Sequence, residues 1–228
     1  MSFDSSLSST PDKLKNFTKY VRRQSIARFL AQTELFQMQI GVKGSIVEGG
    51  VHHGGGVMCW AQLSATLEPY NYHRRVIGFD TFEGFPHVSS QDDSGRPEVA
   101  AGLFAVDYDV FDEISEQVRE FDSNRFLGEI SKVELIRGDA TVEMPAYVER
   151  NPHLIVSMLY LDFDLYEPTV SAIGTFLPRM PKGGVIVFDE ANNPHWPGET
   201  RALLDSLEIG DRELRCFVYE PNISYVIL

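Results

Sequence analysis

The sequence predicts an α/β fold, in which a mostly parallel sheet carries helices on both of its faces. The first observation is that short apolar segments alternate with longer amphipathic segments from Gly44 onward, which is the order of parallel strands joined by helices. The second is the end of the chain, where the apolar segments "ELRCFVYEP" and "ISYVIL" meet at "EPN". We expect two antiparallel strands joined at "EPN", because parallel strands need a much longer crossover.

The elements are expected in the following order. Residues 1–43 form an N-terminal helical segment, since residues such as Leu14 and Phe17 recur at helical spacing; one long helix and two shorter ones are both open. Residues 44–228 form the α/β domain, with central strands at "SIVEGGV", "RRVIGFD", "KVELIRGDA", "HLIVSMLYLDFD" and "GGVIVFDE". Helices are expected at "GVMCWAQLSATLE", "EPTVSAIGTFLPRM" and "PGETRALLDSL". With the terminal pair this gives a Rossmann-like, seven-stranded sheet with an antiparallel last strand, the order expected of class I methyltransferases.

One connection in this domain is unusually long. It lies between the second and third strands, at about residues 86–131, and contains "PHVSSQDDSGRPEVAAGLFAVDYDVFDEISEQVREF". A connection of this length in a compact domain is usually a lid, a binding element or a small helical excursion. Its acidic residues are interpreted as a solvated surface in preference to a metal site.

The composition excludes several classes of protein. A formal net charge of −13 argues against a general affinity for nucleic acid or anionic lipid, which carry the same sign of charge. The two cysteines, Cys59 and Cys216, lack the paired spacing of a zinc site or a disulfide framework. The polar, acidic start differs from a signal peptide, and no apolar run approaches a membrane span. We therefore expect a cytoplasmic protein with no nucleic-acid or membrane partner.

The first strand leads into a glycine-rich loop, "VEGGVHHGGGV". Ligands of open α/β sheets bind outside the carboxyl ends of the strands, and glycines allow the backbone to approach a ligand closely. The positions of Gly50, Gly54 and their neighbouring glycines do not match the G-x-G-x-x-G dinucleotide pattern. Glu48 is an acid inside an apolar strand end, where it can hold a ligand ammonium group such as the amino group of a methionine moiety. We favour ligand binding over tight packing as the role of this loop.

The second and third strands each end in an acid. Asp80, in "VIGFDTFEGFP", stands where nucleotide-binding and S-adenosylmethionine-binding proteins place the acceptor for ribose hydroxyls. Asp139, in "RGDAT", can accept a hydrogen bond from an adenine amine, or it can be the N-cap of the next helix. Neither residue alone distinguishes one nucleoside cofactor from another.

The fourth and fifth strands end in pairs of acids, in "LDFDLYE" and "VIVFDEAN". Because adjacent parallel strands lie about 5 Å apart, their ends can gather these carboxylates into one cluster, and a divalent cation would relieve the repulsion within it. All-oxygen ligands favour Mg²⁺, Ca²⁺ or Mn²⁺ over zinc. The alternative is that some of the acids cap helices or pair with Arg179, Lys182 or Arg201. The acids concerned are Asp162, Asp164, Asp189 and Glu190.

A metal at this edge would lower the pKa of a substrate hydroxyl, and a neighbouring carboxylate would remove its proton. Asp162 and Asp164 are two residues apart and share a face if the chain stays extended, so one can ligate while the other acts as the base. His195, shortly after the fifth strand, is a competing base or substrate contact. His52 and His53, beside the glycines, are secondary candidates.

These segments together resemble the macrocin O-methyltransferase family. The resemblance runs from about Lys43 to Leu207 and rests on "VEGGVHHGGGV", "GFDTFEGFP", "LYLDFDLYEPTVSAIGTFLPRMPKGGVIVFDE" and "PGETRALLDSL". It implies a cofactor, S-adenosylmethionine (SAM), a hard divalent cation such as Mg²⁺, and a homo-oligomer. By resemblance, Asp164 is the general base and the metal ligands are Asp162, Asp189 and Glu190. The cofactor pocket would be lined by Glu48, Gly50, Gly54, Asp80, Thr81, Phe82, Asp139 and Ala140.

The chain departs from the family pattern at two positions of this block. Phe163 stands between the two acids of the fourth strand, where the family often has Gly, and its ring would fill space near the substrate. Glu190 stands where Asp is frequent, which keeps an oxygen ligand but changes its reach. The first departure bears on the shape of the substrate and the second on the geometry of the metal.

The expected function is a SAM- and Mg²⁺-dependent O-methyltransferase acting on a sugar hydroxyl, with a nucleotide-linked 6-deoxyhexose as the acceptor. Similarity to dTDP-6-deoxy-L-hexose 3-O-methyltransferases favours that acceptor. A macrolide glycoside, an aminocoumarin glycoside or a catechol-like diol is the alternative. An NAD(P)-dependent oxidoreductase is an alternative of another class, against which the glycine spacing and the lack of a Tyr-x-x-x-Lys motif argue. A catalytically silent SAM-binding or assembly protein is the third.

Overall fold

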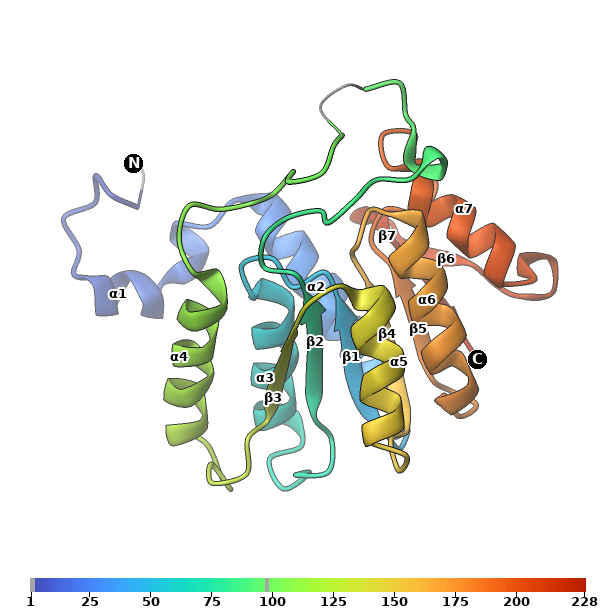
Figure 1. Ribbon diagram of the computed structural model, residues 1–228. Coiled ribbons are helices and arrows are strands. Elements are labelled where there is room, and N and C mark those ends of the chain that lie inside the picture. Colours follow the sequence, from blue (N-terminus) through green and yellow to red (C-terminus); the bar gives the residue numbers. More distant parts are fainter. Residues whose placement is uncertain (1–2, 97–98) are drawn as a thin grey trace.

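The computed structural model describes residues 3–96 and 99–228, and it confirms the α/β prediction. Its seven strands form one sheet in the order β3-β2-β1-β4-β5-β7-β6, with β1 to β5 parallel and β7 antiparallel to both of its neighbours (Figure 1). The strand order reverses between β1 and β4, so ligands are expected beside the carboxyl ends of these two strands. The strands are β1 Ser45–Gly49, β2 Val76–Asp80, β3 Val133–Arg137, β4 Val156–Leu161, β5 Val185–Phe188, β6 Arg215–Phe217 and β7 Glu220–Ile227.

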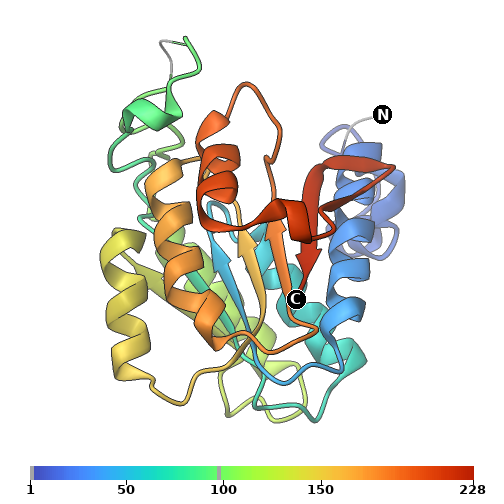
Figure 2. The same cartoon turned by 90° about the vertical axis from the view of Figure 1, so that its right-hand side faces the viewer.

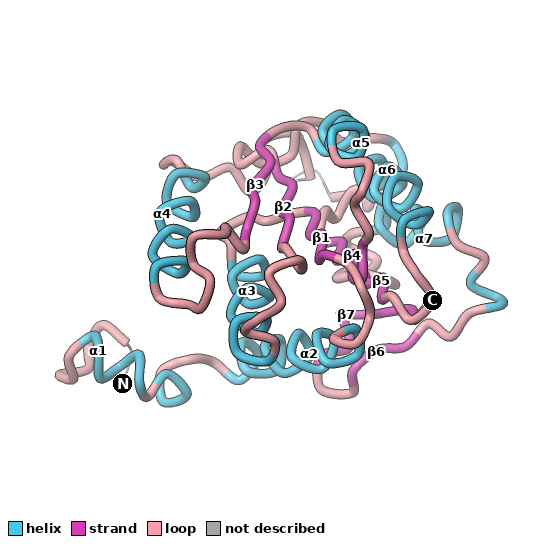
Figure 3. Tube along the Cα trace, turned by 90° about the horizontal axis from the view of Figure 1, so that it is seen from below, coloured by secondary structure: helices cyan, strands magenta, loops and turns pink. Residues whose placement is uncertain are grey.

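Helices pack on both faces of the sheet, as Figures 1 and 3 show. Successive strand residues point to opposite faces, so Ile46 packs in the core of one face and Val47 in the core of the other. None of the helices in the described part of the chain combines the length and the hydropathy that crossing a membrane would need. One face carries α2 Arg23–Gln39, α3 Gly55–Leu67 and α4 Val110–Ser123, and the other carries α5 Ala140–Arg150, α6 Tyr166–Phe176 and α7 Pro197–Ser206.

The described part of the N-terminal segment contains two α-helices, separated by a 3₁₀ turn at Phe17–Lys19, which decides the alternative that the sequence left open. The short α1, Thr10–Lys15, is capped by Ser9 and lies away from the sheet (Figure 3). The longer α2 contacts α3, β5 and β7, and it buries Leu35 and Phe36 completely. Figure 2 shows α2 beside the C-terminal hairpin. This packing carries the residues of α2 to the carboxyl edge of the central strands.

The long connection between β2 and β3 contains a 3₁₀ turn at Ser90–Asp92 and then α4. Residues 97–98 of this expected insertion, like residues 1–2 of the N-terminal segment, lie outside the described residues. Asp92 is buried, and its Oδ1 accepts a hydrogen bond from the backbone N–H of Tyr166 at 2.7 Å. One carboxylate therefore fastens the connection to the segment that follows β4.

The C-terminal hairpin confirms the antiparallel prediction, but its turn is not where the sequence placed it. The chain turns at residues 218–219, and "EPN" lies inside β7. The pairing shifts between Cys216 and Phe217, so that Cys216 faces Ser224 whereas Phe217 faces Glu220. This irregularity accommodates Pro221, because a bulge tolerates a residue with no N–H to donate. The expectation of a turn at "EPN" was therefore wrong.

Candidate functional site

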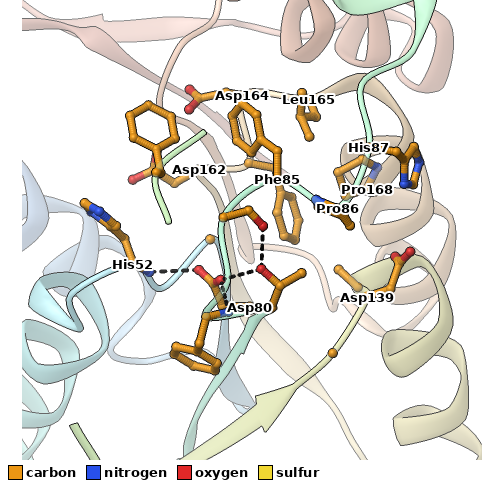
Figure 4. A pocket seen from close by; sticks show the side chains of 18 of the residues that line it. His52, Asp80, Phe85, Pro86, His87, Asp139, Asp162, Asp164, Leu165 and Pro168 are labelled. Carbon is orange, nitrogen blue, oxygen red and sulfur yellow. Dashed lines mark hydrogen bonds between the residues drawn. The ribbon is translucent and has the colours of Figure 1, made fainter. Parts of the chain in front are cut away.

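Two neighbouring cavities lie at the carboxyl edge of the central strands. The first cavity, drawn in Figure 4, lies against the ends of β1 to β5 and the start of the long connection. The second cavity lies between α2 and the β1 loop. Gly50, His52 and Asp162 line both. Of the residues predicted from the sequence, the second cavity also contains Glu48, and the first contains Asp80, Thr81, Phe82, Asp139, Ala140, Asp164 and Glu190.

The glycine loop is shaped by packing as well as by access to a ligand. Gly50 has φ +84°, and a Cβ atom there would lie 1.9 Å from the carbonyl oxygen of Asp162. Gly54 has φ +81°, and its Cβ would lie 2.9 Å from the side chain of Ile114 on α4. Gly50 therefore lets β1 and β4 approach each other beside the cavities, whereas Gly54 makes room for α4.

Asp80 organises the loops around the first cavity. Its Oδ2 accepts hydrogen bonds from the backbone N–H groups of Val51 and His52, at 2.7 and 2.8 Å, and its Oδ1 accepts one from Phe82 N–H at 2.7 Å (Figure 4). Thr81 completes the turn by donating its hydroxyl to the Gly84 carbonyl at 2.6 Å. These bonds occupy most of the accepting positions of the carboxylate. Asp80 thus holds the β1 and β2 loops together, and its ribose contact stays a prediction.

Asp139 is the N-cap of α5, which was one of its two predicted roles. Its Oδ1 accepts hydrogen bonds from the backbone N–H and the hydroxyl of Thr141, at 2.9 and 2.7 Å. The residue also lines the first cavity together with Ala140. A cap that uses one carboxylate oxygen leaves the other for a ligand, so the two predicted roles are compatible.

Glu48 is the buried acid of the second cavity. It is 2% exposed, and Trp60 on α3 donates its indole N–H to Oε2 at 2.5 Å. A Cβ atom on Gly56 would lie 2.3 Å from Oε1, so only glycine fits beside the carboxylate. Burial raises the pKa of Glu48 to about 8, against the lowering effect of the Trp60 hydrogen bond and the Arg28 charge. A bound cationic group would favour the ionised form.

The acids of β4 and β5 that were predicted as metal ligands are paired with other side chains in this structure. Arg28 of α2 donates from Nη1 to Asp189 Oδ2 at 3.0 Å and from Nη2 to Asp162 Oδ2 at 2.9 Å. Glu190 instead accepts a hydrogen bond from the side-chain amide of Asn193. Over residues 3–96 and 99–228, no group of three or more His, Cys, Asp and Glu side chains is placed to hold a metal ion.

The residues in this arrangement therefore do not fit a divalent cation, because a guanidinium already neutralises two of the three predicted ligands. Pairing with a basic side chain was the alternative role predicted for these acids. The side chains predicted for it were wrong, because the one that pairs is Arg28. Arg179 donates to the carbonyls of Pro152 and Leu154, and Arg201 donates to the carbonyl of Gln91. The residue that pairs is Arg28, which lies about 130 to 160 positions earlier in the chain, on the N-terminal helix α2.

Asp164 lies apart from this pair, on the wall of the first cavity (Figure 4). β4 ends at Leu161, and Asp164 has φ +62°, so the chain turns instead of continuing extended. The expectation that Asp162 and Asp164 share one face of an extended strand is therefore not met. Burial first, and then the charges of Glu190 and Asp189, raise the pKa of Asp164 to about 8. A carboxylate with this pKa can accept a proton near neutral pH.

Left-handed backbone conformations recur around the first cavity. His52, Phe82 and Asp164 have φ values of 50°, 57° and 62°, and each follows the end of a central strand. Such conformations cost about 1–3 kcal/mol each for residues other than glycine and cluster at functional sites. Asp80 accepts hydrogen bonds from two of these residues, so the loops are held in place by side chains at the strand ends.

An aromatic wall closes the first cavity opposite the strand ends. Phe85, Phe104 and Trp196 have ring centroids 5.3 to 6.1 Å apart in T-shaped or tilted contacts, and all three line the cavity. His195 is exposed and lies outside both cavities; its backbone N–H donates to Asn193 Oδ1 at 2.9 Å. An aromatic slot was predictable from "GLFAVDYDVF", which contains Phe104, whereas no local signal joined Phe85 and Trp196 to it.

The Phe163 ring packs into the core and also borders the first cavity, so its expected effect on the shape of the substrate stays a prediction. Phe163 is 8% exposed and belongs to the core of the α5–α7 face. A Cβ atom on Gly49 would lie 2.2 Å from its ring, so the glycine at the end of β1 provides the space that the ring fills. The departure from the family pattern at this position is therefore accommodated by the core.

Comparisons with known proteins agree with this architecture. A family profile described as Macrocin-O-methyltransferase (TylF) matches residues 20–202. An 8-demethyl-8-(2,3-dimethoxy-alpha-L-rhamnosyl)-tetracenomycin-C 4'-O-methyltransferase of Streptomyces olivaceus is 30% identical over 156 residues, which are 66% of this chain and 54% of that protein. This chain therefore spans about half the length of that curated relative.

Two solved structures are similar over nearly the whole chain. A crystal structure of the calicheamicin methyltransferase CalS11 is 32% identical, with a TM-score of 0.94, and the match covers 98% of this chain and 87% of the other. An apo structure of the same protein, described as a TDP-rhamnose 3'-O-methyltransferase, is 30% identical with a TM-score of 0.84, covering 98% and 88%.

Proposed function

This chain belongs to the macrocin O-methyltransferase family, and from that premise we propose that it transfers the methyl group of SAM to a hydroxyl of a nucleotide-linked 6-deoxyhexose. The observation that carries the proposal is the position of Asp164 in the first cavity. It lines the same cavity as Asp80 and Asp139, which suit a nucleoside, and as an aromatic wall that suits a sugar. Relatives described as acting on TDP-rhamnose and on a rhamnosyl group support a deoxysugar acceptor.

The residues of the chain suit the proposed cofactor. Bound SAM supplies an electrophilic methyl group on a sulfonium. Asp80 and Asp139 present carboxylate oxygens to hydroxyl and amine donors of the nucleoside, and the backbone approaches closely at Gly50. Glu48 presents a buried acid to the ammonium group. The wall of the first cavity is completed by Thr81, Phe82 and Ala140.

Asp164 acts as the general base in this proposal. It accepts the proton of the sugar hydroxyl as the oxygen attacks the methyl carbon, and no covalent intermediate with the enzyme is required. Phe85, Phe104 and Trp196 hold the sugar against the strand ends and exclude water, and such positioning supplies much of the rate. The proposal assigns neither step to His195, which lies outside both cavities.

Magnesium dependence stays a prediction from the sequence. Because Arg28 binds Asp162 and Asp189, a divalent cation would have to displace a guanidinium from the same oxygens. We therefore expect Arg28→Ala to bind Mn²⁺ at least ~10-fold more tightly than the wild type does. Electron paramagnetic resonance of Mn²⁺ measures the two affinities. Equal affinity would show that the two cations do not compete. Loss of transfer in a chelator, with recovery on adding Mg²⁺, would support the sequence prediction.

The proposed reaction is tested with methyl-labelled SAM and three acceptors. TDP-rhamnose, free rhamnose and a rhamnosylated aromatic polyketide are incubated with the wild type and with Asp164→Asn, and the products are identified by mass spectrometry. We expect label to appear on TDP-rhamnose with the wild type and to be strongly reduced with the variant. Transfer to none of the three acceptors would contradict the proposal.

A glycoside acceptor is the second candidate. The curated relative is described as acting on a rhamnosyl tetracenomycin, that is, on a sugar already joined to an aromatic aglycone. The aromatic wall could contact such an aglycone as well as a sugar face. Transfer to the rhamnosylated polyketide and not to TDP-rhamnose would favour this candidate.

A homo-oligomer and a cytoplasmic location are retained as predictions. The N-terminal segment exposes apolar side chains on α1, α2 and the turn between them, which supports a contact between copies. Sedimentation velocity of the wild type tests the prediction, and a monomer at micromolar concentration would contradict it. The exposed side chains are Leu14, Phe17, Val21, Phe29 and Leu30.

A further inference from the structure

The second cavity is lined by a positively charged side chain, Arg28, for which the sequence predicted no function. Arg28 of α2 and Glu48 of β1 both line it, and they are close enough for their charges to interact. Among the described residues that line this cavity, Arg28 is the one with a permanent positive charge, and Glu48 is the most deeply buried acid. A ligand with both an anionic and a cationic group would match the two.

Arg28 is held in a fixed position and still faces the cavity. Its hydrogen bonds to Asp162 and Asp189, with a further contact of 2.9 Å between Nη2 and Asp189 Oδ1, engage at most three of the five N–H donors of the guanidinium. Tyr160 donates its hydroxyl to Asp189, so the carboxylate that orients Arg28 is itself oriented. The Arg28 side chain is 39% exposed and lines the second cavity. Such a fixed planar cation is well suited to a carboxylate.

The second cavity adjoins the first beside the end of β1, where one ligand can occupy both. Gly50, His52 and Asp162 line both cavities, so a ligand held by Asp80 and Asp139 in the first can extend past Gly50 into the second. The methionyl end of SAM carries one carboxylate and one ammonium group. Its charges are those that Arg28 and Glu48 complement.

We propose that Arg28 binds the carboxylate of the methionyl end of SAM, while Glu48 faces the ammonium group. This assignment rests on the proposed function and adds a cofactor-binding residue from the N-terminal helices. It also gives Asp162 and Asp189 a role that needs no metal, because they fix the orientation of the guanidinium. The α2 helix thereby becomes part of the cofactor site.

The test compares two ligands that differ only in the carboxylate. S-adenosylhomocysteine and its decarboxylated analogue, S-adenosyl-3-thiopropylamine, are titrated calorimetrically into the wild type, Arg28→Ala, Arg28→Lys and Arg23→Ala. Arg23 is an exposed arginine on the same helix and serves as the matched control. Thermal unfolding of each variant establishes that it is folded.

We expect the wild type and Arg23→Ala to bind S-adenosylhomocysteine at least ~10-fold more tightly than the analogue. Arg28→Ala should bind the two ligands equally, and Arg28→Lys should retain part of the preference because it keeps the charge without the planar fork. Equal binding of the two ligands by the wild type would overturn the assignment and needs no variant. An equal loss for both ligands in Arg28→Ala would overturn it as well. Failure of the wild type to bind either ligand would instead overturn the proposed function, and the assignment with it.

Discussion

Replacing Asp164 with Asn should lower activity and raise stability at the same time. The pKa of Asp164 rises from 3.8 to about 8 in the folded protein. At 1.36 kcal/mol per pKa unit, its ionised form is destabilised by at most about 6 kcal/mol. Between pH 4 and pH 8 the folded state binds one proton more than the unfolded state, so stability falls as the pH rises through this window.

Asn has no charge, so Asp164→Asn removes this cost. Because the side chain is partly accessible, we take about a third of the upper limit and expect about 2 kcal/mol of added stability at pH 8. For a chain of this size that corresponds to a Tm increase of roughly 4–8 °C, with little change at pH 4. Activity should fall by about 10²- to 10⁴-fold, because a general base is lost.

The assay combines a pH–rate profile with thermal unfolding at pH 4, 6 and 8. For the wild type, kcat/KM should rise with pH and level off above about pH 8, where Asp164 becomes ionised. Asp211→Asn, at an exposed position, is the control and should change neither activity nor Tm. The reasoning is refuted if Asp164→Asn keeps wild-type activity. It is also refuted if the variant is less stable than the wild type by the same amount at pH 8 and at pH 4.

Three further substitutions test the framework of the site. Asp92→Ala leaves the Tyr166 N–H without its acceptor, so the free energy of unfolding in urea should fall by about 1–3 kcal/mol and kcat should fall as well. An unchanged free energy of unfolding would contradict the anchoring role. Trp196→Ala should raise the KM for the sugar by about 5- to 10-fold and leave the Kd of S-adenosylhomocysteine unchanged, so a parallel rise in both would count against a sugar-facing wall. Gly50→Ala would bring a Cβ within 1.9 Å of the Asp162 carbonyl at a φ of +84°, and should destabilise the fold by at least about 2 kcal/mol; a Tm equal to that of the wild type would disprove this account.

The fold was predictable because its signals are local. Apolar runs of strand length alternate with amphipathic segments, and strand burial in the structure follows them closely, as in the fully buried run Val156–Leu161. The hairpin turn was misplaced because "EPN" has typical turn residues, whereas the actual turn, Val218 and Tyr219, has none. The bulge that lets Pro221 stay within β7 depends on pairing with β6, which local propensity does not contain.

The site was predictable where residues follow strand ends. The parallel sheet brings Asp80, Asp139, Asp164 and Glu190 to one edge, and all four line the first cavity. Sequence reasoning failed where a partner comes from a distant helix, as with Arg28. A basic residue on an amphipathic helix is usually solvated, so nothing local distinguishes it from Arg23.

The sequence by itself determined the sheet, the helices that cover it and the set of acids at its carboxyl edge. Periodicity and strand order are sufficient for these features, because each depends on neighbours along the chain. The tertiary structure alone decided which cation neutralises Asp162 and Asp189, and which way Asp164 points. The first outcome depends on how α2 packs against β5 and β7, and the second on the left-handed turn after β4. The packing of α2 and the strain of that turn are both stabilised by contacts between segments far apart in the chain.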